Sequence, residues 1–251
     1  MPAPFLSVII PSFNEQSNIQ RGVLDEVVKY LSKQEYDYEV ILSDDGSTDG
    51  TTQQLQAFAD AHPCVKLLAN KHAGKGPTVR AGMLAATGQW RLFTDFDQST
   101  PISELDVFMP YIREYEVVVG SREAERAKRA DEPLLRHLMG RVFNTIVRIL
   151  AVPGMRDTQC GFKLFSAQAT ERLFNQLYIY GGVAQIPDAF TGAFDVELLY
   201  LARKNNYAIK EVGVHWSHFA SDRVSPIKDS LRMLRDIIRI RLADLTGKYQ
   251  S

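Results

Sequence analysis

The sequence predicts an α/β fold with a mostly parallel, Rossmann-like sheet flanked by helices. Short apolar runs alternate with helix-length amphipathic segments through the first half of the chain, which is the pattern of βαβ units. A polar cluster follows each of the first four apolar runs, and parallel sheets bind ligands at the carboxyl ends of their strands. With 251 residues, 45% hydrophobic and 24% charged, the chain is long enough to bury a substantial core.

The first half is predicted to hold four strand–loop–helix units and a fifth strand. The run 5–10 is β-rich and is closed by Pro11, and a turn then leads into helical periodicity over 17–33. The following units repeat this order, with Gly, Asp and Asn clusters between each strand and its helix. The further strands are predicted at 38–43, 65–69, 90–94 and 116–120, and the further helices at 52–61, at 77–86 and from Ser103.

The second half is less regular. Apolar residues recur at helical spacing over 134–152, 194–205 and 226–244, and short apolar runs predict strands at 162–165 and 208–214. No repeat or Pro/Ser-rich linker divides the chain, so we expect one main domain over 1–225. The segment 226–251 is expected to carry a C-terminal amphipathic helix.

Composition excludes several classes of protein. Lys and Arg total 29 against 30 Asp and Glu, so no overall positive field favours nucleic acid. Cys64 and Cys160 are too few for a disulfide framework and lack the paired spacing of a zinc site, which fits a reducing compartment. No apolar run reaches the roughly 18 residues of a membrane span, and the N-terminus lacks the basic region of a signal peptide. We therefore expect a cytoplasmic protein.

Two carboxylates, Asp95 and Asp97, follow the fourth predicted strand at positions i and i+2. A turn there can aim both at one Mg²⁺ or Mn²⁺ ion that also holds substrate phosphate. An isolated pair of this kind more often caps a helix, with Asp97 and Ser99 as the caps before Pro101. The place of the pair at the end of a parallel strand favours the metal site.

A second acidic cluster, 44–51, follows the second predicted strand. A carboxylate there can accept the imide N–H of uracil, or the N1–H and amino group of guanine. Asp49 or Thr48 fits the role of helix cap, and we expect Asp44 or Asp45 to read the base.

Glycines flank Lys75 after the third predicted strand. Neither a Walker loop nor a G-x-G-x-x-G fingerprint is present, which weakens the P-loop and NAD alternatives. Glycine beside Lys75 and Arg80 suits the close approach of a nucleotide, and a solvated turn with surface cations is the alternative.

Eight runs of sequence, taken in order, resemble the inverting family-2 glycosyltransferases with the GT-A fold. The first five runs lie between residues 7 and 122. The later runs RDTQCGFKLF (156–165), AFDVELLYLA (193–202) and VGVHW (212–216) resemble the branch of that family that transfers glucose to dolichyl phosphate, which is related to the mannose-transferring branch. The resemblance spans nearly the whole chain.

The resemblance implies roles for residues on both sides of the site. Asp97 would be the principal metal ligand, Asp95 would lie by the ribose and the metal, and Ser99 matches a further ligand position. The nucleotide sugar would be bound by Pro11, Phe13, Glu15, Asp44, Asp45, Lys75 and Asp95. The acceptor phosphate would be bound by Arg122, Arg136, Gln159 and Lys163. The candidate catalytic residues are Asp95, Asp97, Arg122, Gln159 and Lys163. Asp195 and Glu197 lie in a matching run without an assigned role.

The implied reaction is transfer of glucose from UDP-glucose to a polyprenyl phosphate with inversion at C1, dependent on Mg²⁺ or Mn²⁺. A phosphate acceptor is largely anionic near pH 7, so a strong general base is dispensable. The nearest alternative is transfer of mannose from GDP-mannose. A non-catalytic nucleotide-sugar-binding module at the membrane is an alternative of another class, and a nucleotidyltransferase ranks third because its N-terminal phosphate loop is missing.

The C-terminal segment offers a way to reach a lipid acceptor. An apolar stripe recurs at helical spacing along it, and basic residues exceed acidic ones between Pro226 and Lys248. Such a helix can lie on the anionic cytoplasmic face of a membrane, and packing on its own domain is the alternative. The stripe consists of Ile227, Leu231, Leu234, Ile238, Leu242 and Leu245.

Three features depart from the family pattern. The eukaryotic branch begins with a membrane span, which this sequence lacks. The segment 178–192 is longer and richer in glycine, so we expect it to shape the acceptor pocket. Phe96 replaces the small residue often found between the two aspartates, and we expect it to alter the donor side.

Overall fold

The computed structural model describes residues 3–130, 145, 147, 150–181, 192–218 and 226–249. The strands are β1 (Leu6–Ser12), β2 (Tyr38–Asp44), β3 (Val65–Ala69), β4 (Trp90–Thr94), β5 (Val117–Ser121), β6 (Lys128–Ala130), β7 (Phe162–Ser166), β8 (Ile209–Gly213) and β9 (His215–Ser217). The α-helices are α1 (Gln16–Gln20), α2 (Val23–Leu31), α3 (Thr51–Ala61), α4 (Lys75–Ala85), α5 (Leu105–Phe108), α7 (Ala167–Gln176), α8 (Phe194–Lys204) and α9 (Pro226–Leu245), with 3-10 turns at Ile102–Glu104 and Met109–Tyr111.

In the part of the chain that the structure describes, seven strands form the main sheet, in the order β3-β2-β1-β4-β7-β5-β8. The strands β1 to β4 pair in parallel, as do β5 and β8, whereas β7 runs antiparallel to both β4 and β5. Strands β6 and β9 form a separate parallel pair. The predicted α/β fold with a mostly parallel sheet is confirmed, and the antiparallel β7 is the exception within it.

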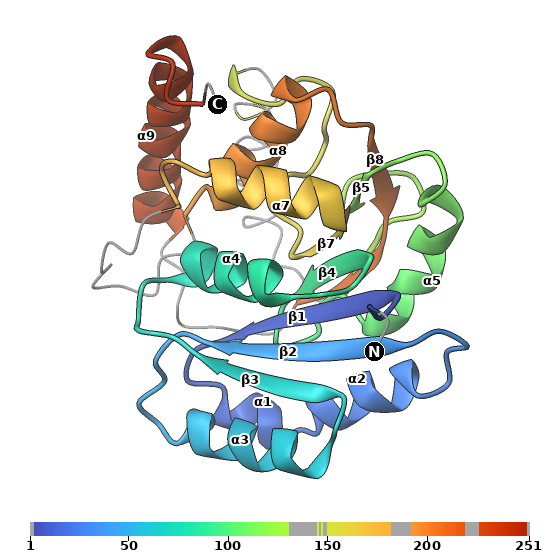
Figure 1. Cartoon of the computed structure of the whole chain (residues 1–251). Coiled ribbons are helices and arrows are strands. Elements are labelled where there is room, and N and C mark those ends of the chain that lie inside the picture. Colours follow the sequence, from blue (N-terminus) through green and yellow to red (C-terminus); the bar gives the residue numbers. More distant parts are fainter. Residues whose placement is uncertain are drawn as a thin grey trace.

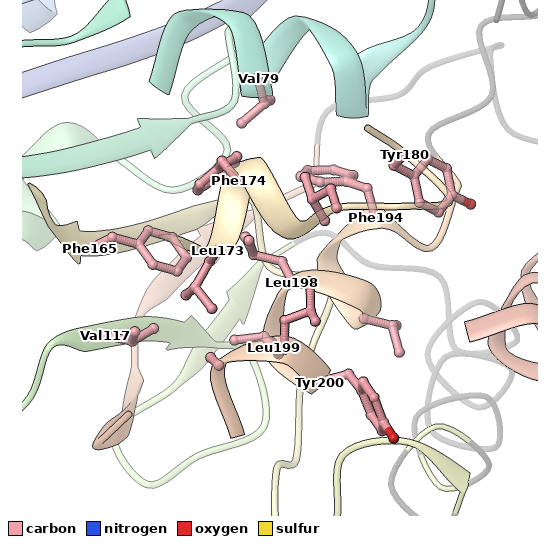
Figure 2. Close-up of a cluster of buried hydrophobic side chains, with 14 of the residues drawn as sticks. Val79, Val117, Phe165, Leu173, Phe174, Tyr180, Phe194, Leu198, Leu199 and Tyr200 are labelled. Atoms are coloured by element: carbon pink, nitrogen blue, oxygen red, sulfur yellow. The ribbon is translucent and has the colours of Figure 1, made fainter. Parts of the chain in front are cut away.

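Helices cover both faces of the sheet (Figure 1). Side chains alternate between the faces along each strand, so Ile9 packs with α4, α7 and α8, whereas Val8 and Ile10 pack with α2 and α3. Figure 2 shows part of the buried cluster that contains Ile9 and the inner faces of α4, α7 and α8. In this cluster Phe165 and Phe174 stand edge to face, with ring centroids 5.7 Å apart. The apolar runs of the sequence therefore form buried strands between two helical layers.

Some predicted elements differ in detail. The helix predicted over 17–33 is divided into α1 and α2 at Gly22, whose φ of +79° is left-handed backbone that a helix interior does not adopt. The helix predicted from Ser103 is short, because Pro110 lacks the N–H that α5 would need to continue. Helix α7 was not predicted, although Ser166 caps it through the Ala169 N–H. Most of the helix predicted over 134–152 lies outside the described residues.

Helix α9 presents two different faces. Asp236, Ile237, Ile240 and Ala243 are buried, and the three apolar ones belong to the core that also holds α8. Four members of the predicted stripe are instead exposed, namely Leu231 (64%), Ile238 (50%), Leu242 (54%) and Leu245 (78%). The helix therefore packs on its own domain through one face and leaves these four side chains of the predicted stripe exposed, whereas Leu234 is partly buried. No helix in the described part of the chain is long and apolar enough to cross a membrane.

Candidate active site

The polar clusters meet at the carboxyl ends of β1, β2 and β4. The register pairs Ser12 with Asp44 across β1 and β2, and the Asp45 N–H donates to the Ser12 carbonyl at 2.8 Å. Strand β4 pairs with β1 on its other side and ends one residue before Asp95. The predicted clusters therefore share one edge of the sheet, as expected for parallel strands.

Asp95 and Asp97 lie at this edge, each partly exposed. The Lys75 ammonium is 2.5 Å from Asp95 Oδ1, and Asp97 Oδ1 accepts the Ser99 N–H at 2.9 Å. Burial raises the pKa of Asp97, and the neighbouring Asp95 charge raises it further. Burial alone would lower the pKa of Lys75, but the carboxylates of Asp95, Asp195 and Asp97 raise it, so the ammonium stays charged.

The acidic pair fits a hard divalent cation. Carboxylate oxygens are the ligands that Mg²⁺ and similar cations prefer. The Lys75 ammonium already contacts Asp95, which shows that positive charge is favoured at this point. Gly161 lies so close that a Cβ there would collide with the Asp95 carboxylate, so the backbone forms one wall of the space around it. Within the described residues, no group of three or more His, Cys, Asp or Glu side chains could hold a metal. Asp95 and Asp97 would therefore leave positions for phosphate oxygens and water.

Asp44 and Asp45, the two candidates for base reading, are both buried. Asp44 accepts hydrogen bonds from the hydroxyls of Ser12, Ser47 and Thr52 and from the Ser47 N–H, at 2.6–3.1 Å. Asp45 accepts the Ala73 N–H at 2.8 Å and the Gly74 N–H at 3.0 Å. The four donors on Asp44 use about the full capacity of a carboxylate. Asp45 has three partners when His72 Nδ1, at 2.9 Å from Oδ2, is included, so it keeps about one more acceptor position than Asp44 for a base.

Phe13 and His72 form a stacked pair beside Asp45. Their ring centroids are 4.5 Å apart at 18°, and His72 Nδ1 lies 2.9 Å from Asp45 Oδ2. His72 therefore lies beside one of the two candidates for base reading. Of the other predicted pocket residues, Pro11 is buried in β1, and Glu15 Oε2 accepts from the Asn18 amide at 2.5 Å. Phe96 is 4% exposed and packs in the core under α2 rather than toward the donor side.

Lys163 is fully buried in the antiparallel strand β7. Its ammonium donates to Asp195 Oδ1 and to the Cys160 carbonyl, both at 2.5 Å. Burial raises the pKa of Asp195, whereas the charges of Lys163 and Lys75 oppose that rise. Lys163 was predicted to bind the acceptor, and the structure shows it paired inside the protein. Asp195 had no assigned role in the sequence, although an aspartate within an apolar helical run signals a buried partner.

Arg122 lies directly after β5 and forms an ion pair with Asp157. Its Nε and Nη2 donate to the two carboxylate oxygens at 2.7 and 2.9 Å, and its guanidinium lies 5.4 Å from the centroid of the Trp216 ring. Burial alone would raise the pKa of Asp157, but the Arg122 charge and the N–H groups of Arg122 and Gln159 hold it well below its usual range. Asp157 was not predicted. It fixes Arg122 and the backbone of Gln159 together.

Gln159 carries an uncompensated polar atom. Among the described residues, its Nε2 is buried without a hydrogen-bond partner, as is Oγ1 of the adjacent Thr158. Buried polar atoms are nearly always paired in native proteins, so this pair of groups suits a ligand. Arg136, the remaining predicted acceptor residue, lies outside the described residues, as does most of the segment 178–192.

Comparison with known proteins decides the family. The model of glycosyl transferase family 2 matches residues 7–174. The chain belongs to this family. It is 34% identical to a dolichyl-phosphate beta-glucosyltransferase of Dictyostelium discoideum over 98% of this chain and 76% of that protein, and 32% identical to the human enzyme of the same name over 99% and 78%. The chain is therefore a glycosyltransferase.

Solved structures share the family fold at low identity. A mannosyltransferase of Pyrobaculum calidifontis, determined with GDP-Man and Mn²⁺, is 19% identical with a TM-score of 0.60, and the match covers 95% of this chain and 65% of that one. A glucosyl-3-phosphoglycerate synthase of Mycobacterium tuberculosis, determined with Mn²⁺ and UDP, gives 19% and 0.58, covering 96% and 79%. These likenesses confirm the GT-A fold that the resemblance implied.

Proposed function

We propose that this family-2 enzyme transfers glucose from UDP-glucose to a polyprenyl phosphate, with inversion at C1 and with a divalent cation on Asp95 and Asp97. The observation that carries the proposal is the match, at about one third identity, to curated relatives named for glucosyl transfer to dolichyl phosphate. It is supported by the acidic pair, Lys75 and the Arg122–Asp157 contact, which offer a cation site and two positive side chains.

The donor end is built from Asp45, the Phe13–His72 pair and Lys75. Asp45 would accept the imide N–H of uracil, and the stacked rings would lie beside the base. Lys75 would turn its ammonium from Asp95 toward the diphosphate. A divalent cation, once bound, would supply Lewis-acid stabilisation of the charge that builds on the leaving nucleoside diphosphate.

The acceptor end is built around Arg122 and Gln159. Asp157 holds Arg122 in a fixed orientation at the edge of β5, where a cationic group attracts a phosphate monoester. The unpaired Gln159 amide would donate to the sugar or to the phosphate. Because the attacking oxygen already carries negative charge near pH 7, the residues need to orient it rather than to remove a proton.

We also propose that α9 rests on the surface of an anionic membrane. Leu231, Ile238, Leu242 and Leu245 are exposed on one side, and the exposed Arg235, Arg239 and Arg241 accompany them. Each basic residue near anionic headgroups contributes about 1 kcal/mol to the free energy of membrane binding. Leucine side chains that enter the headgroup region add to that free energy. This arrangement would bring the site to a substrate that stays in the bilayer.

Purified full chain with Mn²⁺ and polyprenyl phosphate, offered UDP-glucose or GDP-mannose in separate reactions, tests the donor. We expect lipid-linked glucose from UDP-glucose and at least 100-fold less product with Asp97→Asn. Lipid-linked mannose as the main product would favour the GDP-mannose alternative. Transfer by Asp97→Asn at the wild-type rate would remove the metal site from the proposal. Binding of UDP without transfer from any donor would favour a non-catalytic module.

A further inference from the structure

A buried ion pair lies next to the acidic pair. Lys163 and Asp195 are 0% and 2% exposed, and their charged atoms are 2.5 Å apart. Taking two charges out of water costs several kcal/mol for each ion, and well-packed apolar residues often stabilise a fold as much or more. Stability of the fold alone therefore gives little reason for this pair.

The pairing of β7 with β4 brings Lys163 close to the acidic pair. Lys163 is the cross-strand partner of Phe93, and its ammonium lies 5.3 Å from the centroid of the Phe93 ring. Two residues later the chain reaches Asp95, whose N–H donates to the Gly161 carbonyl at 3.1 Å. Any charge on Lys163 that is not compensated therefore acts directly on the site.

The charged side chains in this region nearly balance. Lys75 pairs with Asp95, and Lys163 pairs with Asp195, which is also electrostatically coupled to Lys75 and Asp95. Asp97 is the remaining carboxylate. Arg21 also reaches this region, where its Nη2 donates to the main-chain carbonyl of Asp97 at 2.6 Å. With Asp195 ionised, three carboxylates therefore face three cationic side chains among the described residues. Without the Asp195 charge, these three cations would outnumber Asp95 and Asp97, and a divalent cation would be disfavoured.

We propose that Asp195 is a positioning residue that neutralises the Lys163 ammonium, so that Asp95 and Asp97 remain available to a divalent cation. The inference rests on the proposed function, because it takes Asp95 and Asp97 as the cation ligands. The role of Asp195 concerns the binding of the cation, whereas the proposed function concerns glucosyl transfer, so an experiment can refute one proposal without the other.

Two titrations of the full chain test the role of Asp195. Mn²⁺ is titrated in the presence of UDP and followed by the electron paramagnetic resonance of free Mn²⁺, and UDP is titrated in the absence of metal by calorimetry. We expect Asp195→Asn to weaken Mn²⁺ binding about tenfold or more, and to leave metal-free UDP binding unchanged or tighter, because the site gains positive charge. A purely structural role would weaken both.

Charge restoration supplies the decisive variants. The double variant Asp195→Asn/Lys163→Met restores the wild-type net charge of the region and is expected to bind Mn²⁺ within about threefold of wild type. Lys163→Met alone removes a positive charge and is expected to bind Mn²⁺ more tightly, which keeps the test valid if the single Asp195 variant does not fold.

Glu39→Gln is the matched control. Glu39 is also a buried carboxylate in an ion pair, with Lys66, but it lies at the start of β2, away from the site. We expect this variant to lose stability with no change in either titration. Wild-type Mn²⁺ affinity in Asp195→Asn, no recovery in the double variant, no tightening in Lys163→Met, or no Mn²⁺ binding by the wild-type chain with UDP would each overturn the proposal. Mn²⁺ binding as expected without glucosyl transfer would refute only the proposed function.

Discussion

Arg122 and Asp157 form a two-pronged contact in which Nε and Nη2 of the guanidinium donate to both oxygens of a fully buried carboxylate. Removing one partner of a buried pair leaves the other charge uncompensated. We expect Asp157→Asn to lower the free energy of unfolding by about 3–5 kcal/mol, and to raise the KM for polyprenyl phosphate more than that for the nucleotide sugar. Urea unfolding and steady-state kinetics measure the two effects.

Asp106→Asn is the control for that variant, because Asp106 accepts one hydrogen bond, from Tyr30, but is exposed. We expect it to change stability by about 1 kcal/mol or less. If Asp157→Asn were as mild as this control, the contact would not organise the acceptor end.

Gly161 is predicted to be sensitive to the smallest side chain. A Cβ at this position would collide with the Asp95 carboxylate, which is the end of a side chain and can move aside. We therefore expect Gly161→Ala to fold and to unfold at nearly the wild-type temperature, but to bind Mn²⁺ with UDP about tenfold more weakly. Unchanged Mn²⁺ affinity would show that the position of the Asp95 carboxylate does not matter for the cation.

Glu39 gives the stability a defined pH dependence. Burial alone would raise its pKa, but the Lys66 ammonium and hydrogen bonds from Thr87 and Ser7 lower it to about 2. A lowered pKa means that the contribution is complete above pH 4.5 and is lost as pH falls toward 2. The difference in unfolding free energy between wild type and Glu39→Gln should therefore shrink by about 3 kcal/mol between pH 5 and pH 2. A difference independent of pH would contradict the assignment.

The exposed stripe of α9 is expected to control membrane binding. Replacing Leu242 and Leu245 by Glu puts two carboxylates among exposed apolar side chains, and we expect sedimentation with anionic vesicles to fall at least tenfold. Gln53→Glu/Ala57→Glu adds the same charge on the exposed side of α3, which covers the opposite face of the sheet (Figure 1). Equal losses in both variants would indicate general repulsion rather than a binding face.

The sequence pattern predicted the first four strands and the position of the acidic pair. Strands β1, β2, β3 and β4 follow apolar runs closed by turn residues, and the acidic pair lies where a parallel sheet binds ligands. The direction of β7 was missed, because a short apolar run has the same pattern whether it pairs in parallel or antiparallel. The antiparallel pairing that brings Lys163 close to Asp95 is therefore known only from the structure.

Contacts between distant residues account for the rest of what was missed in the site. Asp157 and Asp195 have partners 35 and 32 residues away, and no spacing rule connects them. His72 lies beside Asp45 because β2 and β3 are neighbours in the sheet. On α9, the sequence pattern indicated the apolar stripe, but only the fold shows that Ile237 and Ile240 face the core and that four members of the stripe are exposed.

The anomeric form of the lipid-linked product tests the central claim most directly. Wild-type chain with Mn²⁺, UDP-glucose carrying ¹³C at C1 and polyprenyl phosphate should give glucosyl phospholipid whose C1 resonance and coupling are those of the β-anomer. Formation of the α-anomer would contradict inversion. Release of free glucose without any lipid product would contradict transfer to a polyprenyl phosphate.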